Sequence, residues 1–278
     1  MLSRDGASPA LLREAALLGV DPPHRHHYRS DATTALLLAL DDAAAGLWDD
    51  AVAVARSAAD IHPMAAYYIG WFEMLRGDVE AARAALSQAR RNPRAFFCPN
   101  EIEAVVALRG ALDLVPDDGH AHYGLGNYLQ SRREYAAAID HWRASTRLLP
   151  DFAAAWRNLG LGLMNHERNG REAMACYERA VALDPNNDRL FFEFDQLRKR
   201  LNVEGDARLA HLESRLDLVR RRDDLLTEYL LLLNGAARHD DALAILRSHK
   251  FHPWEGGEGK PTLHFETALA ELARAALE

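Results

Sequence analysis

Cysteine is nearly absent from this sequence, with only 2 residues in 278, at positions 98 and 176. They lie far apart and form no Cys-x-x-Cys pair, so the sequence offers neither a thiolate metal site nor a disulfide framework. Long apolar runs are also missing, and the run Ala35–Leu40 is too short to cross a bilayer. The amino terminus lacks the basic start and long apolar core of a secretion signal. We therefore expect a cytoplasmic protein without a bound metal or cofactor.

Strand-favouring residues are scarce, and aromatic residues make up only 8% of the chain. The apolar fraction is 49%, and much of it is alanine and leucine, which are strong helix formers. Positive charge is also in short supply: 33 Lys and Arg oppose 41 Asp and Glu, a formal net charge of -8. An acidic chain has no general attraction for phosphate backbones. These features favour an all-α protein and argue against nucleic acid or membranes as partners.

A repeat of about 35 residues is marked by prolines. Pro116, Pro150 and Pro185 follow one another at intervals of 34 and 35 residues, and each interval has the pattern helix, short turn, helix. Aligned on the prolines, the same residue types recur, which are Leu125-Gly126 with Leu159-Gly160, Leu129 with Leu163, Ala138 with Ala173, and Trp142 with Tyr177. Two units in register indicate a real repeat, because a chance match would need many small and large positions to agree.

This pattern resembles the tetratricopeptide repeat (TPR), a helix pair of 34 residues. In such a pair, Gly126 and Gly160 are expected where the two helices cross closely, opposite the small Ala138 and Ala173. Trp142 and Tyr177 are expected to fill the gap to the next pair, and the prolines to end each second helix. The resemblance implies a TPR-type α-solenoid, a right-handed superhelix of antiparallel helix pairs.

Weaker units flank the two clear ones. The expected organisation has four parts, which are a poorly ordered or capping segment (1–30), degenerate TPR-like pairs (31–115), two well-matched TPR units with a following helix (116–202), and further TPR-like helices (203–278). In the second part, Pro93 and Pro99 interrupt the first helix of one pair. The last apolar helix has no evident polar cap, so we expect a piece of a longer protein.

Several stretches also resemble a bacterial family of long, uncharacterised proteins, in which a domain rich in β-sandwich structure precedes a TPR array. The stretches are NPRAFFCPNEIEAVVAL, AAWRNLGLGLMN, NDRLFFEFDQLRKRLN, RRDDLLTEYLLLLN and HKFHPWEGGEGK. The resemblance covers roughly residues 30 to 278. The look of the front domain, which has no counterpart here, implies a link to carbohydrate metabolism.

The first helix of each pair lines the concave groove in TPR arrays. By alignment, five polar residues are expected to project there, namely Tyr123, Asn127, Arg157, Asn158 and Arg189. Some TPR proteins hold the terminal carboxylate of a peptide with Asn and basic residues from successive units. Asn127, Asn158 and Arg189 fall on such positions, but Tyr123 replaces a Lys and Glu193 replaces an Arg. The match is partial, and a solvated groove without a ligand remains the alternative.

The loop FHPWEGGEGK, residues 251–260, gathers five residues that could contact a ligand, which are His252, Trp254, Glu255, Glu258 and Lys260. The two acids could form an acid–base pair with help from His252. The glycines and Lys260 could bind an anion, although no phosphate-binding motif is matched. The favoured interpretation is a connector in which Pro253 ends one helix, the glycines permit a sharp turn, and Trp254 fills the joint.

Two further clusters give weaker signals. His24, His26 and His27 could bind a metal, but no carboxylate or thiolate with ligand spacing lies nearby, so an adventitious cluster is favoured. Cys176 is expected to be a small buried hydrophobe, and no His and acid arrangement supports a nucleophilic role for it or for Cys98. The sequence thus predicts a non-catalytic scaffold that binds a protein or peptide, or the β-rich domain of its parent, through the TPR groove. The alternative is an accessory region of a carbohydrate-active enzyme, with the 251–260 loop at the substrate site.

Overall fold

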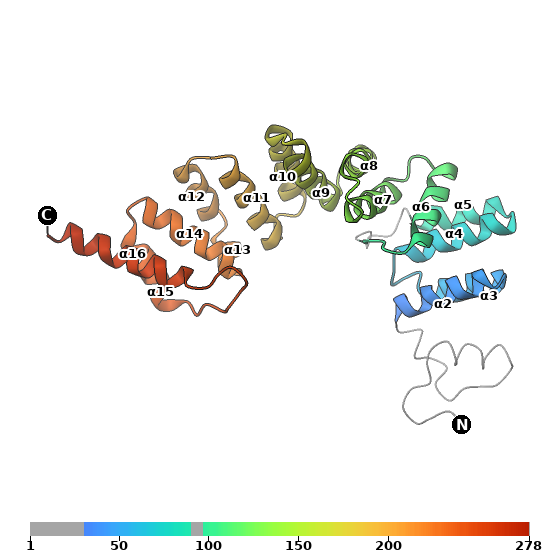
Figure 1. The fold of residues 1–278 in the computed structure, drawn as a ribbon, viewed down its shortest axis with the longest axis horizontal. Coiled ribbons are helices and arrows are strands. Elements are labelled where there is room, and N and C mark those ends of the chain that lie inside the picture. Colours follow the sequence, from blue (N-terminus) through green and yellow to red (C-terminus); the bar gives the residue numbers. More distant parts are fainter. Residues whose placement is uncertain (1–30, 90–96, 278) are drawn as a thin grey trace, which may run out of the picture. The chain divides into compact units, whose positions relative to one another are not determined.

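All regular secondary structure in the described residues is helical, as the computed structural model of residues 31–89 and 97–277 shows (Figure 1). This confirms the predicted all-α class. The chain divides into two compact units, Met1–Ala155 and Trp156–Glu278. Within each unit, most helices pack as antiparallel neighbours, as an α-solenoid requires.

The described part of the first unit, residues 31–89 and 97–155, contains three helix pairs and one further helix, α6. Its helices are α2 (Ala32–Ala44), α3 (Trp48–Ser57), α4 (Met64–Arg76), α5 (Val79–Ala89), α6 (Ile102–Leu114), α7 (Gly119–Ser131) and α8 (Tyr135–Leu148). The pairs are α2 with α3, α4 with α5, and α7 with α8, whereas α6 packs on α4 and α7. Residues 97–101, which precede α6, form no helix, as the prolines predicted.

The second unit continues the same design. Its elements are α9 (Ala153–Gly162, which begins just before the unit boundary), the π-helical turn η2 (Leu163–Glu167), α10 (Gly170–Leu183), α11 (Asp188–Arg200), α12 (Gly205–Glu213), α13 (Leu216–Val219), α14 (Asp223–Gly235), α15 (His239–Ser248) and α16 (Lys260–Ala275). Its core is rich in leucine from α12, α13 and α14, and α16 packs against α14 and α15.

The two repeat glycines lie where their helices approach closely, as predicted. A Cβ atom on Gly126 would lie 2.5 Å from Nε1 of Trp142, and one on Gly160 would lie 2.8 Å from Cδ2 of Tyr177. These distances are too short for any side chain, so only glycine fits. Trp142 and Tyr177 therefore fill the crossing within their own pair. Tyr177 also reaches the next pair, as predicted, because its ring stacks 6.3 Å from that of Phe194 on α11.

The stretch 207–222 does not form one continuous helix. It is broken between α12 and α13 at Arg215, whose backbone leaves the helical region (φ -141°, ψ 52°). The Arg215 guanidinium donates to the carbonyl of Pro185 and to Asn186 and Asp217. The contacts to Pro185 and Asn186 tie the break to the loop that precedes α11.

The capping segment 1–30, with His24, His26 and His27, lies outside the described residues. Within the described ranges, no helix combines the length and apolar character needed to cross a membrane.

Candidate protein-binding surface

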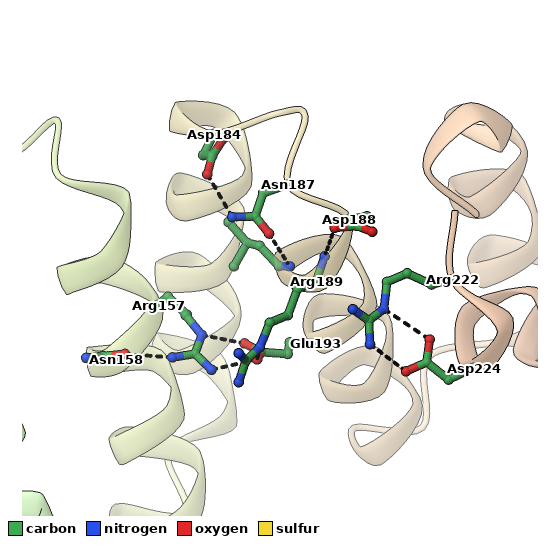
Figure 2. Close-up of polar contacts among 10 residues, drawn as sticks. Arg157, Asn158, Asp184, Asn187, Asp188, Arg189, Glu193, Arg222 and Asp224 are labelled. Carbon is green, nitrogen blue, oxygen red and sulfur yellow. Dashed lines mark hydrogen bonds and ion pairs between the residues drawn. The ribbon is translucent and has the colours of Figure 1, made fainter. Parts of the chain in front are cut away.

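A cluster of two arginines and one glutamate joins α9 to α11 (Figure 2). Arg157 donates through Nε and Nη2 to the two carboxylate oxygens of Glu193, at 2.6 Å each. The remaining guanidinium nitrogen of Arg157, Nη1, donates to Oδ1 of Asn158 at 3.0 Å. Arg189 adds a bond from Nε to Oε1 of Glu193 at 3.1 Å. The bidentate geometry fixes the Arg157 guanidinium in one orientation.

The charges in this cluster do not balance. Burial alone would raise the pKa of Glu193, but hydrogen bonds and the charges of Arg157 and Arg189 bring it below its usual range. Glu193 is therefore ionised at neutral pH. Among these three side chains, two guanidinium groups oppose one carboxylate, which leaves one positive charge. The nearby carboxylate of Asp188 accepts from the backbone N–H of Arg189. The Arg189 side chain is 70% exposed, so this charge faces solvent.

An apolar pocket of about 230 Å³ lies beside the cluster, within the second unit. It is lined by Leu161, Met164, Asn165, Tyr177, Phe192, Glu193, Gln196, Leu197 and Arg200. Two features of its rim can contact a ligand. Nε2 of Gln196 is buried and has no hydrogen-bond partner. Arg200 is exposed and donates to Oδ1 of Asn165 at 2.6 Å. Because Asn165 is neutral, the Arg200 guanidinium adds a second net positive charge to the rim.

A second arginine–carboxylate pair supports the far wall of this pocket. Arg222 donates through Nε and Nη2 to the two carboxylate oxygens of Asp224, at 3.0 and 2.7 Å (Figure 2). Its guanidinium carbon lies 5.4 Å from the ring centroid of Phe192, a pocket residue. This cation–π contact helps to hold the Phe192 ring in place.

The predicted groove residues fall into both units and have different roles. Arg157 and Arg189 lie on the surface described above, but Asn158 is buried beneath Arg157. Tyr123 is completely buried in the first unit, where its ring meets Phe97 and Phe152 edge-on. The Tyr123 ring is thus part of the core, and we do not include it among the partner-binding residues.

Asn127 is held by contacts within the first unit. Its Nδ2 donates to the carbonyl of Phe97 at 2.8 Å, and its Oδ1 accepts from Nε1 of Trp142 at 3.0 Å. It thereby ties the non-helical segment before α6 to the α7–α8 pair. The resemblance suggested a site for the terminal carboxylate of a peptide. In the structure, Arg157 already donates to the carboxylate of Glu193.

The 251–260 loop is attached to the start of α14 by one carboxylate. Asp223 accepts from the backbone N–H of His252 at 2.7 Å and lies 2.7 Å from Nε2 of His249. The Trp254 ring covers Gly257, where a Cβ atom would lie 2.0 Å from its Cε2. Gly256 and Gly259 both have positive φ. The turn glycines and the Trp254 packing match the connector interpretation, but Pro253 does not end the preceding helix, because α15 already ends at Ser248.

The charged residues of the loop point to solvent. Glu255, Glu258 and Lys260 are exposed, and none lines the 260 Å³ hollow that His252, Pro253 and Trp254 form with the start of α14. Glu255 and Glu258 therefore do not form an enclosed acid pair. The roles of these residues in ligand binding remain predictions.

Removing the Asp223 carboxylate is expected to release the loop. In an Asp223→Ala variant, residues 249–257 lose their polar attachment, and their amide hydrogens should exchange at least tenfold faster. The measurement is hydrogen exchange followed by mass spectrometry. Asp206→Ala, which removes an exposed acid from the first turn of α12, serves as the control. Unchanged exchange in the Asp223 variant would show that Trp254 packing alone holds the loop.

The two cysteines lie in different environments. Cys176 is buried in α10, as expected, and Cys98 is exposed. The described residues contain no group of three or more His, Cys, Asp or Glu side chains arranged to hold a metal ion.

Sequence reasoning missed the pocket beside Arg157. The signal was nonetheless there, because Arg189, Glu193, Gln196 and Arg200 recur at helical spacing on one face of α11. The repeat alignment singles out polar residues at matched positions, whereas much of the pocket lining is apolar and lies between those positions.

Comparison with known proteins supports the repeat assignment. Residues 36–95 and 119–188 match the tetratricopeptide-repeat family model, so these two segments contain TPRs. Repeats of this kind typically mediate protein–protein interaction through an extended surface.

Similar curated proteins are much longer than this chain. It is 32% identical over 128 residues to protein O-mannosyl-transferase TMTC1 of Homo sapiens, a match that covers 45% of this chain and 13% of that protein. The Mus musculus protein of the same name is 33% identical over 125 residues, covering 44% of this chain and 12% of that protein. The chain thus spans only a small part of the length of these relatives.

The comparison with solved structures found similarity to proteins that include the following two. MamA from Desulfovibrio magneticus RS-1 is 19% identical with a TM-score of 0.41, covering 69% of this chain and 97% of that one. PilF of Pseudomonas aeruginosa is 16% identical with a TM-score of 0.42, covering 87% of this chain and 99% of that one.

Proposed function

We propose that this chain is a non-catalytic, cytoplasmic protein-binding module that recognises an acidic segment of a partner at the α9–α11 surface. That surface consists of the apolar pocket, the Arg157–Arg189–Glu193 cluster and Arg200. The observation that carries the proposal is the combination of an apolar pocket with a net positive rim in a chain whose overall charge is -8. The partner is a protein or peptide, or another domain of a longer parent protein.

Each part of the surface has a role in this recognition. The pocket of about 230 Å³ accommodates one apolar side chain, which is a typical anchor in a protein interface. Gln196 offers its buried amide donor to a backbone carbonyl of the bound segment, which would supply the partner it lacks. Arg189 and Arg200 attract carboxylates that flank the anchor. Arg157 is committed to Glu193 and keeps that carboxylate from repelling the ligand.

Two synthetic peptides test this proposal on the full chain. Both carry one leucine, flanked by aspartates in the first and by lysines in the second, and binding is measured by fluorescence polarisation. The aspartate peptide should bind at least tenfold more tightly, and its affinity should fall as salt is added. Arg189→Ala should weaken it about tenfold, because one charge-assisted hydrogen bond is lost.

Matched variants separate this surface from general charge effects. Arg247→Ala removes the same charge from an exposed position on α15 and should leave affinity unchanged. Phe192→Ala enlarges the pocket and should weaken both peptides. Equal binding of the two peptides, or an equal effect of the Arg189 and Arg247 variants, would refute recognition at this surface.

A second candidate function rests on the similarity to protein O-mannosyl-transferases. In this alternative, the chain is an accessory region of a carbohydrate-active enzyme, and the 251–260 loop lies near the substrate. Glu255→Gln in the full natural protein that contains the chain should then reduce turnover of a glycosyl donor and acceptor. Unchanged turnover would remove this candidate without affecting the α9–α11 proposal.

A further inference from the structure

The first unit contains a separate pocket of about 450 Å³ with the opposite electrostatic character. It lies between α2, the start of α4 and the non-helical residues 97–101. A regular helix pair would place its first helix before α6, but residues 97–101, the described part of that segment, form no helix. The pocket therefore results from an interruption that the other pairs do not share.

The wall formed by residues 97–101 is firmly anchored. The Phe97 ring lies 6.0 Å from that of Tyr67 and 6.1 Å from that of Tyr123. A Cβ atom on Gly124 would lie 2.3 Å from Cε2 of Phe97, so the ring uses the space that this glycine leaves. Together with the bond from Asn127 to the Phe97 carbonyl, these contacts hold the Phe97 side of the pocket in place.

The lining combines apolar walls with one carboxylate. Leu36, Leu40 and Met64 supply apolar surface, and Glu101 supplies the charge; the described lining residues include no lysine or arginine. The surrounding field is negative as well. Burial, followed by the charges of Glu101 and Glu103, raises the pKa of the Tyr68 hydroxyl. Burial lowers the pKa of His62, so its ring is neutral at pH 7 and does not offset the carboxylates.

These properties favour a ligand with an apolar stem and a cationic head. Lysine and arginine side chains have this construction, and they bury their methylene groups while keeping the charge near a carboxylate. An acidic ligand would be repelled by Glu101. A purely apolar ligand would cover that carboxylate without pairing its charge, because Asn100 offers it only neutral donors. We propose that the pocket receives a lysine or arginine side chain from an apolar segment of a partner protein.

The native Cys98 provides a direct probe, since it is exposed and lines the pocket. The full chain is treated with a maleimide in the presence of capped peptides Ala-Leu-Xaa-Leu-Ala, in which Xaa is arginine or glutamate. Alkylation of Cys98 is followed by mass spectrometry, with buried Cys176 as the internal reference. The arginine peptide should slow alkylation at least fivefold at saturation, and the glutamate peptide should have no effect.

Two variants show whether protection comes from this pocket. Glu101→Gln should weaken the arginine peptide about tenfold, whereas Glu80→Gln on α5 should not change it. Leu40→Arg places a cation inside the pocket and should abolish protection even if Glu101 affects folding. No protection by the arginine peptide, or equal protection by both peptides, would overturn the proposal. So would a Cys98 that is unreactive in the free chain, because the chain itself would then cover the pocket.

Discussion

Replacing Arg208 with alanine is expected to lower the free energy of unfolding by about 3–5 kcal/mol, because the change strands a buried charge. Asp195 is completely buried and receives two hydrogen bonds from the Arg208 guanidinium, at 3.0 and 2.5 Å. The same guanidinium reaches Glu228 at 3.1 Å, so one side chain joins α11, α12 and α14. Without it, the carboxylate of Asp195 must be protonated or hydrated.

Urea unfolding followed by circular dichroism provides the measurement. Arg274→Ala removes an exposed ion pair with Glu271 on α16 and should cost less than about 1 kcal/mol. The double variant Arg208→Met with Asp195→Leu replaces the pair by apolar groups and should retain most of the stability. A loss below about 1 kcal/mol for Arg208→Ala would mean that water or another group reaches Asp195 readily.

Trp142→Ala is expected to destabilise the first unit by about 3–5 kcal/mol, the usual cost of deleting a large buried ring. Trp142 is 2% exposed and fills the crossing of α7 and α8 against Gly126. It also donates to Asn127, which in turn holds the Phe97 carbonyl. Its removal therefore leaves a cavity and loosens the non-helical segment before α6.

The matched variant is Trp142→Phe, which keeps most of the ring volume but loses the indole donor. Its cost should be about 1–3 kcal/mol, because Oδ1 of Asn127 is left without its donor. Thermal unfolding by circular dichroism measures both variants. Equal stability of the alanine and phenylalanine variants would show that the ring does not support the helix crossing.

The repeat could be predicted from the sequence because its determinants are local. Gly126 and Gly160 recur at nearly the same distance from the following proline, and each requires a close helix crossing that no other residue allows. The break at Arg215 could not be predicted in this way. It depends on hydrogen bonds to Pro185 and Asn186, about 30 residues away, that no local pattern reveals.

The candidate site was predicted only in part for a related reason. Alignment placed Arg157 and Arg189 on the first-helix face, where the structure has them. It could not show that Tyr123 is buried. The Tyr123 ring packs against Phe97, which lies in the non-helical segment before α6, and the repeat pattern does not describe that segment. Nor could it show that Glu193 binds Arg157, since the two residues are joined across α9 and α11 rather than along one helix.

Amide hydrogen exchange of the full chain, with and without the aspartate–leucine peptide, tests the central claim most directly. If the α9–α11 surface binds an acidic segment, the peptide should slow exchange in residues 156–165 and 188–200. The lysine–leucine peptide should leave those residues unchanged. Protection confined to other helices, or the same protection by both peptides, would contradict the account.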